Sequence, residues 1–221
     1  MLFQKGKFVK SFIMALKAED LEDPARYRQI LVIPYSELIT FVLDYIRRKS
    51  GLMFFFWSAC LIFLGIAVKV RINIAGYFPF SSILLHSTLG LIVFPILCVP
   101  LHEFLHVIPF YLSGAKNIRV GMDIKQYLFY VTAHRHVATP LQFRIVALTP
   151  FLIISAGLIL LVFLLPGLWK WSLSIFLFAH ATMCAGDFAL LNFYFLNRDK
   201  KIYTWDDVDK KVAYFYEKLE K

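Results

Sequence analysis

Four long apolar segments, separated by polar connections, dominate the pattern of hydrophobic and polar positions. Each segment is about as long as the roughly 20 apolar residues that a helix needs to cross a membrane. The pattern therefore predicts an all-α membrane protein with about four transmembrane helices. The segments are Gly51–Val68, Ile83–Ser113, Ile145–Leu165 and Trp171–Leu196.

The connection between the second and third apolar segments has a different pattern. Residues 117–124 ("NIRVGMDI") and 126–137 ("QYLFYVTAHRHV") are rich in β-branched and aromatic residues. Such composition is typical of short strands, so we expect a β-hairpin here. An extended peptide could pair with the edge of that hairpin.

The two ends of the chain are more polar and predict amphipathic helices. Ser36, which follows Pro34, is a typical helix start and would lead into the first span. In the tail, Thr204 predicts a second helix start, and apolar residues follow it at helical spacing. These residues are Trp205, Val208, Val212, Phe215 and Leu219.

Composition supports a membrane protein. The chain is 59% hydrophobic and only 18% charged, whereas soluble domains average about 25% charged residues. Its mean hydropathy is +0.65. The three cysteines, Cys60, Cys98 and Cys184, all fall in apolar segments, where we expect them to pack as small hydrophobic residues.

The basic residues indicate the orientation in the cell membrane. Nine Lys and Arg lie in residues 1–49, five in 114–144 and seven from residue 198 onward, against three elsewhere. Basic residues concentrate on the cytosolic side, so we expect both termini and the hairpin to be cytosolic. The net charge of +9 is spread along the chain. It predicts contact with anionic lipid rather than with nucleic acid.

These patterns together divide the chain into three regions. We expect a cytosolic basic and amphipathic segment at 1–49, a four-span membrane domain at 50–197 and a cytosolic helical tail at 198–221.

The second span contains the sequence "HEFLH", in which His102, Glu103 and His106 match the H-E-x-x-H motif. Two histidines four residues apart lie on one face of a helix and can bind the same Zn²⁺. Glu103 lies beside them and could serve as the general base of a hydrolytic site. Ionisable residues are costly inside a membrane span, so a functional role is favoured over hydrogen-bonded packing.

A catalytic zinc site normally has three protein ligands, so a third ligand is expected from another segment. Asp187 is the only carboxylate in a span besides Glu103. Counting from the cytosolic ends of spans two and four places it level with the motif. It could instead be a structural partner of a polar group. His134 and His136 on the hairpin remain alternatives, as ligands or as groups that contact substrate or stabilise an oxyanion.

Two further histidines have weaker claims. His180 lies two helical turns before Asp187 and is expected to pack near the site rather than to bind the metal. His86 lies near the outer end of span two. Pro95 and Pro100, which precede the motif, could kink the span and admit water.

The H-E-x-x-H late in one span, with Asp187 in a later span, resembles the site-2 protease class of intramembrane zinc metalloproteases. The pair Gly186–Asp187, the four-span size and the run "ALTPFL" at 147–152 are more similar to a smaller branch of bacterial membrane zincin peptidases. The resemblance covers roughly residues 80–197. The larger site-2 proteases have Leu-Asp-Gly around the aspartate, and this chain departs from that pattern.

Motif and resemblance together predict a zinc metallopeptidase that cleaves peptides or membrane proteins at the level of the bilayer. A second hypothesis is a non-catalytic membrane adaptor or immunity-type protein with a structural metal site, although such a site has no use for Glu103. A metal or proton transporter has less support, because the outer halves of the spans carry few polar residues.

Overall fold

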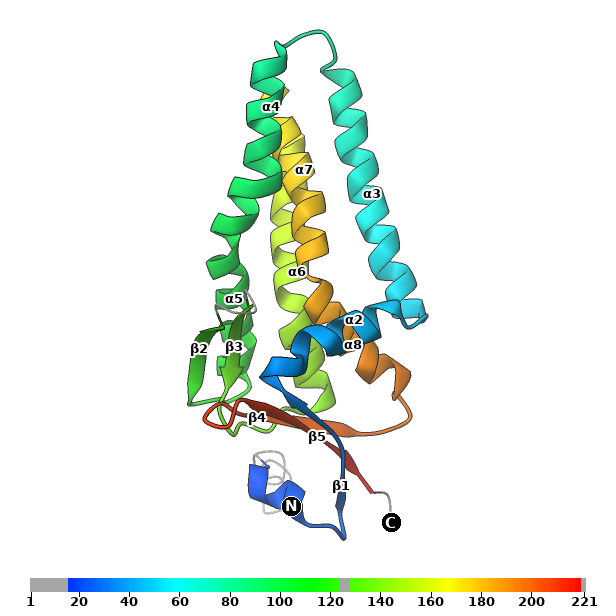
Figure 1. Cartoon of the computed structure of the whole chain (residues 1–221), viewed down its shortest axis with the longest axis vertical. Coiled ribbons are helices and arrows are strands. Elements are labelled where there is room, and N and C mark those ends of the chain that lie inside the picture. The colour runs from blue at the N-terminus through cyan, green and yellow to red at the C-terminus, as the bar shows by residue number, and fades with distance from the viewer. Residues whose placement is uncertain (1–15, 124–127, 220–221) are drawn as a thin grey trace, which may run out of the picture.

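The computed structural model describes residues 16–123 and 128–219. It shows a bundle of long helices with a small β-sheet across one end and a β-hairpin beside it (Figure 1). The connection between α3 and α4 lies at the opposite end of the bundle. The helices are α2 (Leu38–Arg47), α3 (Gly51–Asn73), α4 (Phe80–Thr88), α5 (Phe94–Leu112), α6 (Pro140–Leu164), α7 (Gly167–Met183) and α8 (Ala185–Leu196).

The long helices have the length and apolar character of membrane spans. By these criteria α3, the continuous helix Phe80–Leu112 and α6 qualify, and the bent pair α7–α8 qualifies as a fourth. Their outward faces carry large exposed apolar side chains, such as Phe54, Phe80 and Phe163. These features are compatible with a multi-pass membrane protein, because lipid rather than water would cover such faces.

Local sequence explains where two of these helices begin. Ser50 caps α3 by accepting a hydrogen bond from the Met53 amide. Thr139 and Gln142 form a reciprocal capping box at the start of α6, and Pro140 occupies its first position. Each device satisfies amide groups that a helix start leaves unpaired.

The second span is one long helix with a π-helical turn, η3 (Leu89–Val93), between α4 and α5. Gly90 lies in this turn and packs directly against α7, where a methyl group would overlap the Ser172 carbonyl oxygen. Pro100 and Pro109 lie inside α5. Each removes one backbone donor from the helix, and α5 remains helical through both.

The fourth span is not the single straight helix that its hydropathy predicts. α7 and α8 meet at Cys184 with a bend of 44°. The bend puts Asp187 in the first turn of α8, where a carboxylate is favoured by the helix dipole.

The predicted hairpin between spans two and three is confirmed. Strands β2 (Ile118–Asp123) and β3 (Leu128–Ala133) pair antiparallel, and the hairpin lies against α5 (Figure 1). Gly121 stands opposite Tyr130, whose ring fills the space that a side chain at position 121 would need.

The prediction of a helical tail at 198–221 is wrong. Residues Ile202–Asp207 form β4 and Val212–Lys218 form β5, and the two strands pair antiparallel. The apolar spacing fits a helix, but alternating burial on β5 and a non-local partner favour strands. That partner is β1 (Tyr27–Pro34), which pairs with β5 and gives the sheet order β1-β5-β4. The all-α expectation therefore holds for the bundle only.

The sheet joins the two ends of the chain across the end of the bundle. Ile33, Ile202 and Phe215 pack with α8 residues in one buried apolar cluster. The fully buried Asn192 of α8 donates to the carbonyls of Tyr45 and Arg48 and accepts from Ser50. These bonds fix α2, which η2 (Tyr35–Glu37) precedes, against the bundle.

Candidate metal centre

Helix α5 places the three motif residues at the inner surface of the bundle. His102 and His106 are both buried, at 8% exposure, and their ring centroids lie 5.1 Å apart. Glu103 is adjacent and lines the same cavity. Potential donor atoms of these three side chains all lie within 4.8 Å of one another. The helical spacing therefore brings the motif together as predicted.

Asp187 of α8 faces both imidazoles. Its two carboxylate oxygens lie 3.3 Å from Nε2 of His102 and 3.5 Å from Nε2 of His106. A charge-assisted hydrogen bond would be shorter, about 2.7–2.9 Å. Two ligand atoms about 2.0–2.1 Å from a tetrahedral zinc lie about 3.3 Å apart. The three side chains thus have donor types that zinc accepts, and each contact, made by a different Asp187 oxygen, has about the length expected between two zinc ligands.

Helix α6 orients one of the two histidines. Nδ1 of His106 donates to the carbonyl oxygen of Val146 at 3.0 Å. This bond fixes the proton on Nδ1 and leaves the lone pair of Nε2 facing Asp187. Nδ1 of His102 is buried and has no partner among the described residues. The two imidazoles therefore differ in how they are held.

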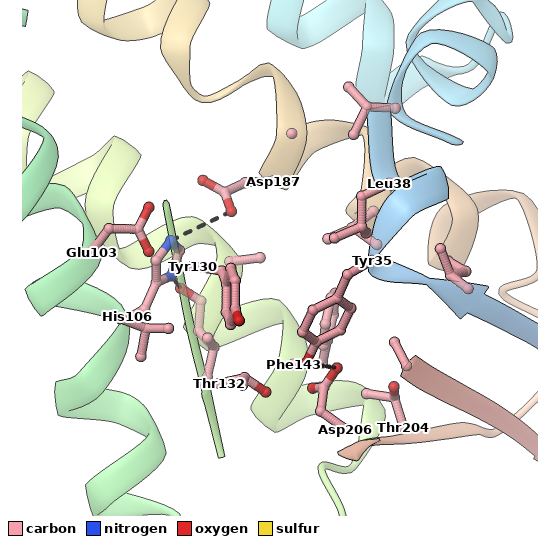
Figure 2. Close-up of a pocket in the computed structure, with 18 of the residues that line it drawn as sticks. Tyr35, Leu38, Glu103, His106, Tyr130, Thr132, Phe143, Asp187, Thr204 and Asp206 are labelled. Atoms are coloured by element: carbon pink, nitrogen blue, oxygen red, sulfur yellow. Dashed lines mark hydrogen bonds and ion pairs between the residues drawn. The ribbon is translucent and has the colours of Figure 1, made fainter. Parts of the chain in front are cut away.

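Figure 2 shows Glu103, His106 and Asp187 converging from α5 and α8 on one cavity. Its volume is about 420 Å³, within the usual range for ligand pockets. The backbone of Val131 in β3 lies beside the Glu103 carboxylate, and Val131 lines the same cavity. The cavity also reaches the β1-β5-β4 sheet, where Tyr35 and Asp206 line it.

The two hairpin histidines do not line this cavity. Nδ1 of His134 accepts a hydrogen bond from the Val208 amide at 3.2 Å, and its Nε2 lies 3.6 Å from Asp209. Nε2 of His136 lies 3.2 Å from the Ser113 hydroxyl. Burial lowers the pKa of His136 below its ordinary value. Both therefore link the hairpin to neighbouring segments and are not brought together with His102.

His180 lies behind the candidate site, as a packing residue would. Its ring is fully buried, with the centroid 5.8 Å from that of His102. Its Nε2 lies 3.8 Å from the Cys184 sulfur. His102, His180 and Cys184 offer a second possible donor set, but neither His180 nor Cys184 lines the cavity. Metal bound there would be closed off from a substrate.

Several cavity residues carry no signal in the sequence. Tyr35, Thr132 and Asp206 come from three separate segments and meet only through the fold. The Val146 carbonyl is a backbone group, which a side-chain motif cannot reveal.

The sequence model of a family described as "Putative zincin peptidase" matches residues 95–203, just under half of the chain. The match supports a zincin-like peptidase family. It spans all four residues of the candidate metal centre. No curated protein and no solved structure matches the chain. A zincin-like family suggests a zinc metallopeptidase, and His102, Glu103 and His106 form a group of donors that could hold a metal ion.

Proposed function

We propose that the chain is an intramembrane zinc metallopeptidase. His102, His106 and Asp187 would hold Zn²⁺, and Glu103 would act as the general base. The observation that carries this proposal is the position of Asp187, with oxygens 3.3 and 3.5 Å from the two Nε2 atoms. Glu103 opens into the same cavity, so a base and a metal-ligand set share one space.

Bound zinc would supply Lewis acidity for the hydrolysis of a peptide bond. The protein's own groups would do the rest. The Glu103 carboxylate would accept a proton from the attacking water and return it to the leaving amine. The Val131 amide, which lies beside that carboxylate, would donate to it and keep it turned into the cavity. The Val146 carbonyl would hold the His106 ring in its ligating orientation.

The substrate in this proposal is a peptide or membrane protein that is locally unwound, because a helix hides its carbonyl groups in hydrogen bonds. In the part of the chain that the structure describes, β3 pairs with β2 on one side only. The backbone of Val131 in this strand lies beside Glu103. The other side of β3 could therefore hold an extended substrate segment beside the site.

We place the protein in the cell membrane with both termini in the cytosol. The three or four apolar helices support the membrane assignment. The sheet supports a shared side for the two ends, because β1 pairs with β5. The excess of Lys and Arg in the same segments favours the cytosol as that side.

The decisive variant is Glu103→Gln in the purified full chain. We expect it to keep about one zinc per chain, because the ligands are untouched, and to lose peptide hydrolysis by at least about 100-fold. Glu37→Gln, at an exposed acid outside the cavity, is the matched control and should hydrolyse at the unsubstituted rate. Zinc content by mass spectrometry and fragments by proteomics of membranes provide the two readouts.

The opposing hypothesis is a non-catalytic adaptor with a structural zinc. It predicts that the unsubstituted chain and Glu103→Gln give the same membrane fragments and the same phenotype in cells. That result, with zinc present in both, would reject the peptidase proposal while keeping the metal centre.

A further inference from the structure

Three oxygen-bearing side chains line the cavity where it reaches the sheet. Tyr35 comes from η2, Thr132 from β3 and Asp206 from β4. Figure 2 shows Tyr35 and Asp206 joined by a hydrogen bond, with Thr132 nearby. Oγ1 of Thr132 is buried and lies near both the Asp206 carboxylate and the Tyr35 hydroxyl. This end of the cavity is therefore polar.

Asp206 has no cationic partner in the described part of the chain. The Tyr35 hydroxyl donates to its carboxylate at 3.3 Å, and the Thr132 hydroxyl lies on the same group. The neighbouring acids in β4 and in the turn after it are paired: Asp207 lies 3.8 Å from Lys210, and Asp209 lies 2.6 Å from Arg119. Burial raises the pKa of the Asp206 carboxyl above its ordinary value. Asp206 thus differs from its neighbours in lacking a counter-charge.

The fold itself does not need an acid at this position. Thr204 and Asp206 alternate along β4 and both line the cavity. An amide would accept the Tyr35 hydrogen bond equally well and would cost less to bury than a carboxylate. An unpaired carboxylate at such a place is explained if a cation enters the cavity and pairs with it.

We propose that Tyr35, Thr132 and Asp206 form a subsite for the cationic side chain of a basic residue in the peptide substrate. An ammonium group has three N–H donors, and these three side chains offer oxygen acceptors around one space. Asp206 supplies the opposite charge. This inference rests on the proposed peptidase function, because the same cavity contains Glu103 and the metal-ligand set. A residue seated at Asp206 would therefore lie in the same cavity as the bond to be cleaved.

The test measures peptide binding without cleavage, in the Glu103→Gln full chain loaded with zinc. Fluorescent octapeptides carry lysine, norleucine, acetyl-lysine or glutamine at each position in turn, and binding is followed by fluorescence anisotropy. At one position we expect lysine to bind at least about tenfold more tightly than the three neutral residues. Adding Asp206→Asn should remove that preference. Adding Asp209→Asn, which removes an exposed acid from the turn between β4 and β5, should leave the preference for lysine unchanged.

Three outcomes would overturn the subsite: no lysine preference at any position, glutamine binding as tightly as lysine, or a preference that survives Asp206→Asn. The peptide series judges the proposal even if Asp206→Asn fails to fold. Cleavage by the chain with Glu103 intact is scored separately. Lysine-selective binding without cleavage would support the subsite and reject the peptidase proposal. Cleavage without a preference for lysine would support the peptidase proposal and reject the subsite.

Discussion

His102 and His106 are equally buried and lie on one face of α5, yet they are held differently. The Val146 carbonyl fixes the ring of His106, whereas Nδ1 of His102 has no partner in the described residues. Asp187 contacts both rings. At the residue scale Asp187 therefore links two histidines that the rest of the protein holds in different ways.

Replacing Asp187 should weaken zinc binding while leaving the fold intact. We expect Asp187→Asn to lower zinc affinity by at least about 100-fold, because the amide lacks the negative charge of the proposed ligand. Competition with a chromogenic chelator measures the affinity. Asp209→Asn is the control for loss of one acid and should bind zinc normally. Unchanged zinc affinity in Asp187→Asn would remove Asp187 from the ligand set and leave only the H-E-x-x-H.

His136 should make the protein less stable in acid. Burial lowers its pKa below the ordinary value of 6.5, so on acidification the unfolded chain takes up a proton before the folded chain does. The stabilisation is present above pH 6.5 and is lost as the pH falls toward the folded-state pKa. His136→Gln cannot take up a proton in this pH range, and its side chain can still form a hydrogen bond with Ser113.

Thermal unfolding in detergent between pH 8 and pH 5 tests this prediction. The chain with His136 should lose more stability over that interval than His136→Gln. His86→Gln, a change of the same type at the opposite end of the bundle, controls for the loss of a histidine. Identical pH profiles with and without His136 would contradict the prediction.

At the element scale, the second span combines a π-helical turn with a close helix contact. Gly90 lies in the turn, and the backbone of Ser172 occupies the space beside its Cα. π-Helical turns inside α-helices are frequently found near functional sites. This turn sits between α4 and the motif-bearing α5, so it sets how α5 continues toward the candidate metal centre.

Gly90→Ala should destabilise the bundle, because its methyl group meets backbone atoms that cannot move aside. We expect a loss of about 1–3 kcal/mol in unfolding free energy. Gly157→Ala in α6 is the matched control, since nothing lies within 4 Å of its added methyl group. It should be neutral or slightly stabilising. Equal unfolding midpoints for the two variants would show that the contact at Gly90 yields easily.

At the scale of the whole molecule, the sheet ties together segments far apart in the sequence. β1 precedes the first span and pairs with β5, which follows the last one. Isolated bridges join His134 to Asp206 and Ala138 to Thr204, so the hairpin connection belongs to the same assembly. Hydrogen bonds between strands cannot cross a bilayer, so we expect all three segments to lie on one side of it.

Cysteine labelling in intact cells tests this arrangement. Cysteines introduced at Lys116 and at Lys210 should react with a membrane-impermeant maleimide only after permeabilisation. Tyr77→Cys, at the exposed turn between α3 and α4, should react without it. The unsubstituted chain, whose three cysteines are buried, gives the background. Different accessibility at positions 116 and 210 would contradict the sheet, and outside labelling of both would invert the orientation.

Local features of the structure follow from the sequence. The apolar segments, the hairpin and the shared face of His102 and His106 depend on residues a few positions apart, and their periodicity is visible in the chain. Asp187 was also predicted, because a carboxylate in a span is conspicuous. Its approach to both imidazoles required the bend at Cys184, which the hydropathy of the fourth span does not reveal.

The tertiary structure alone decided the rest. Helical spacing in the tail was overridden because β1, nearly 200 positions away, offers β5 backbone hydrogen bonds. A local pattern cannot report a partner at that separation. For the same reason, the meeting of Tyr35, Thr132 and Asp206 in one cavity could not be foreseen. Each is an ordinary polar residue in its own segment, and only the packing of the sheet on the bundle removes them from water together.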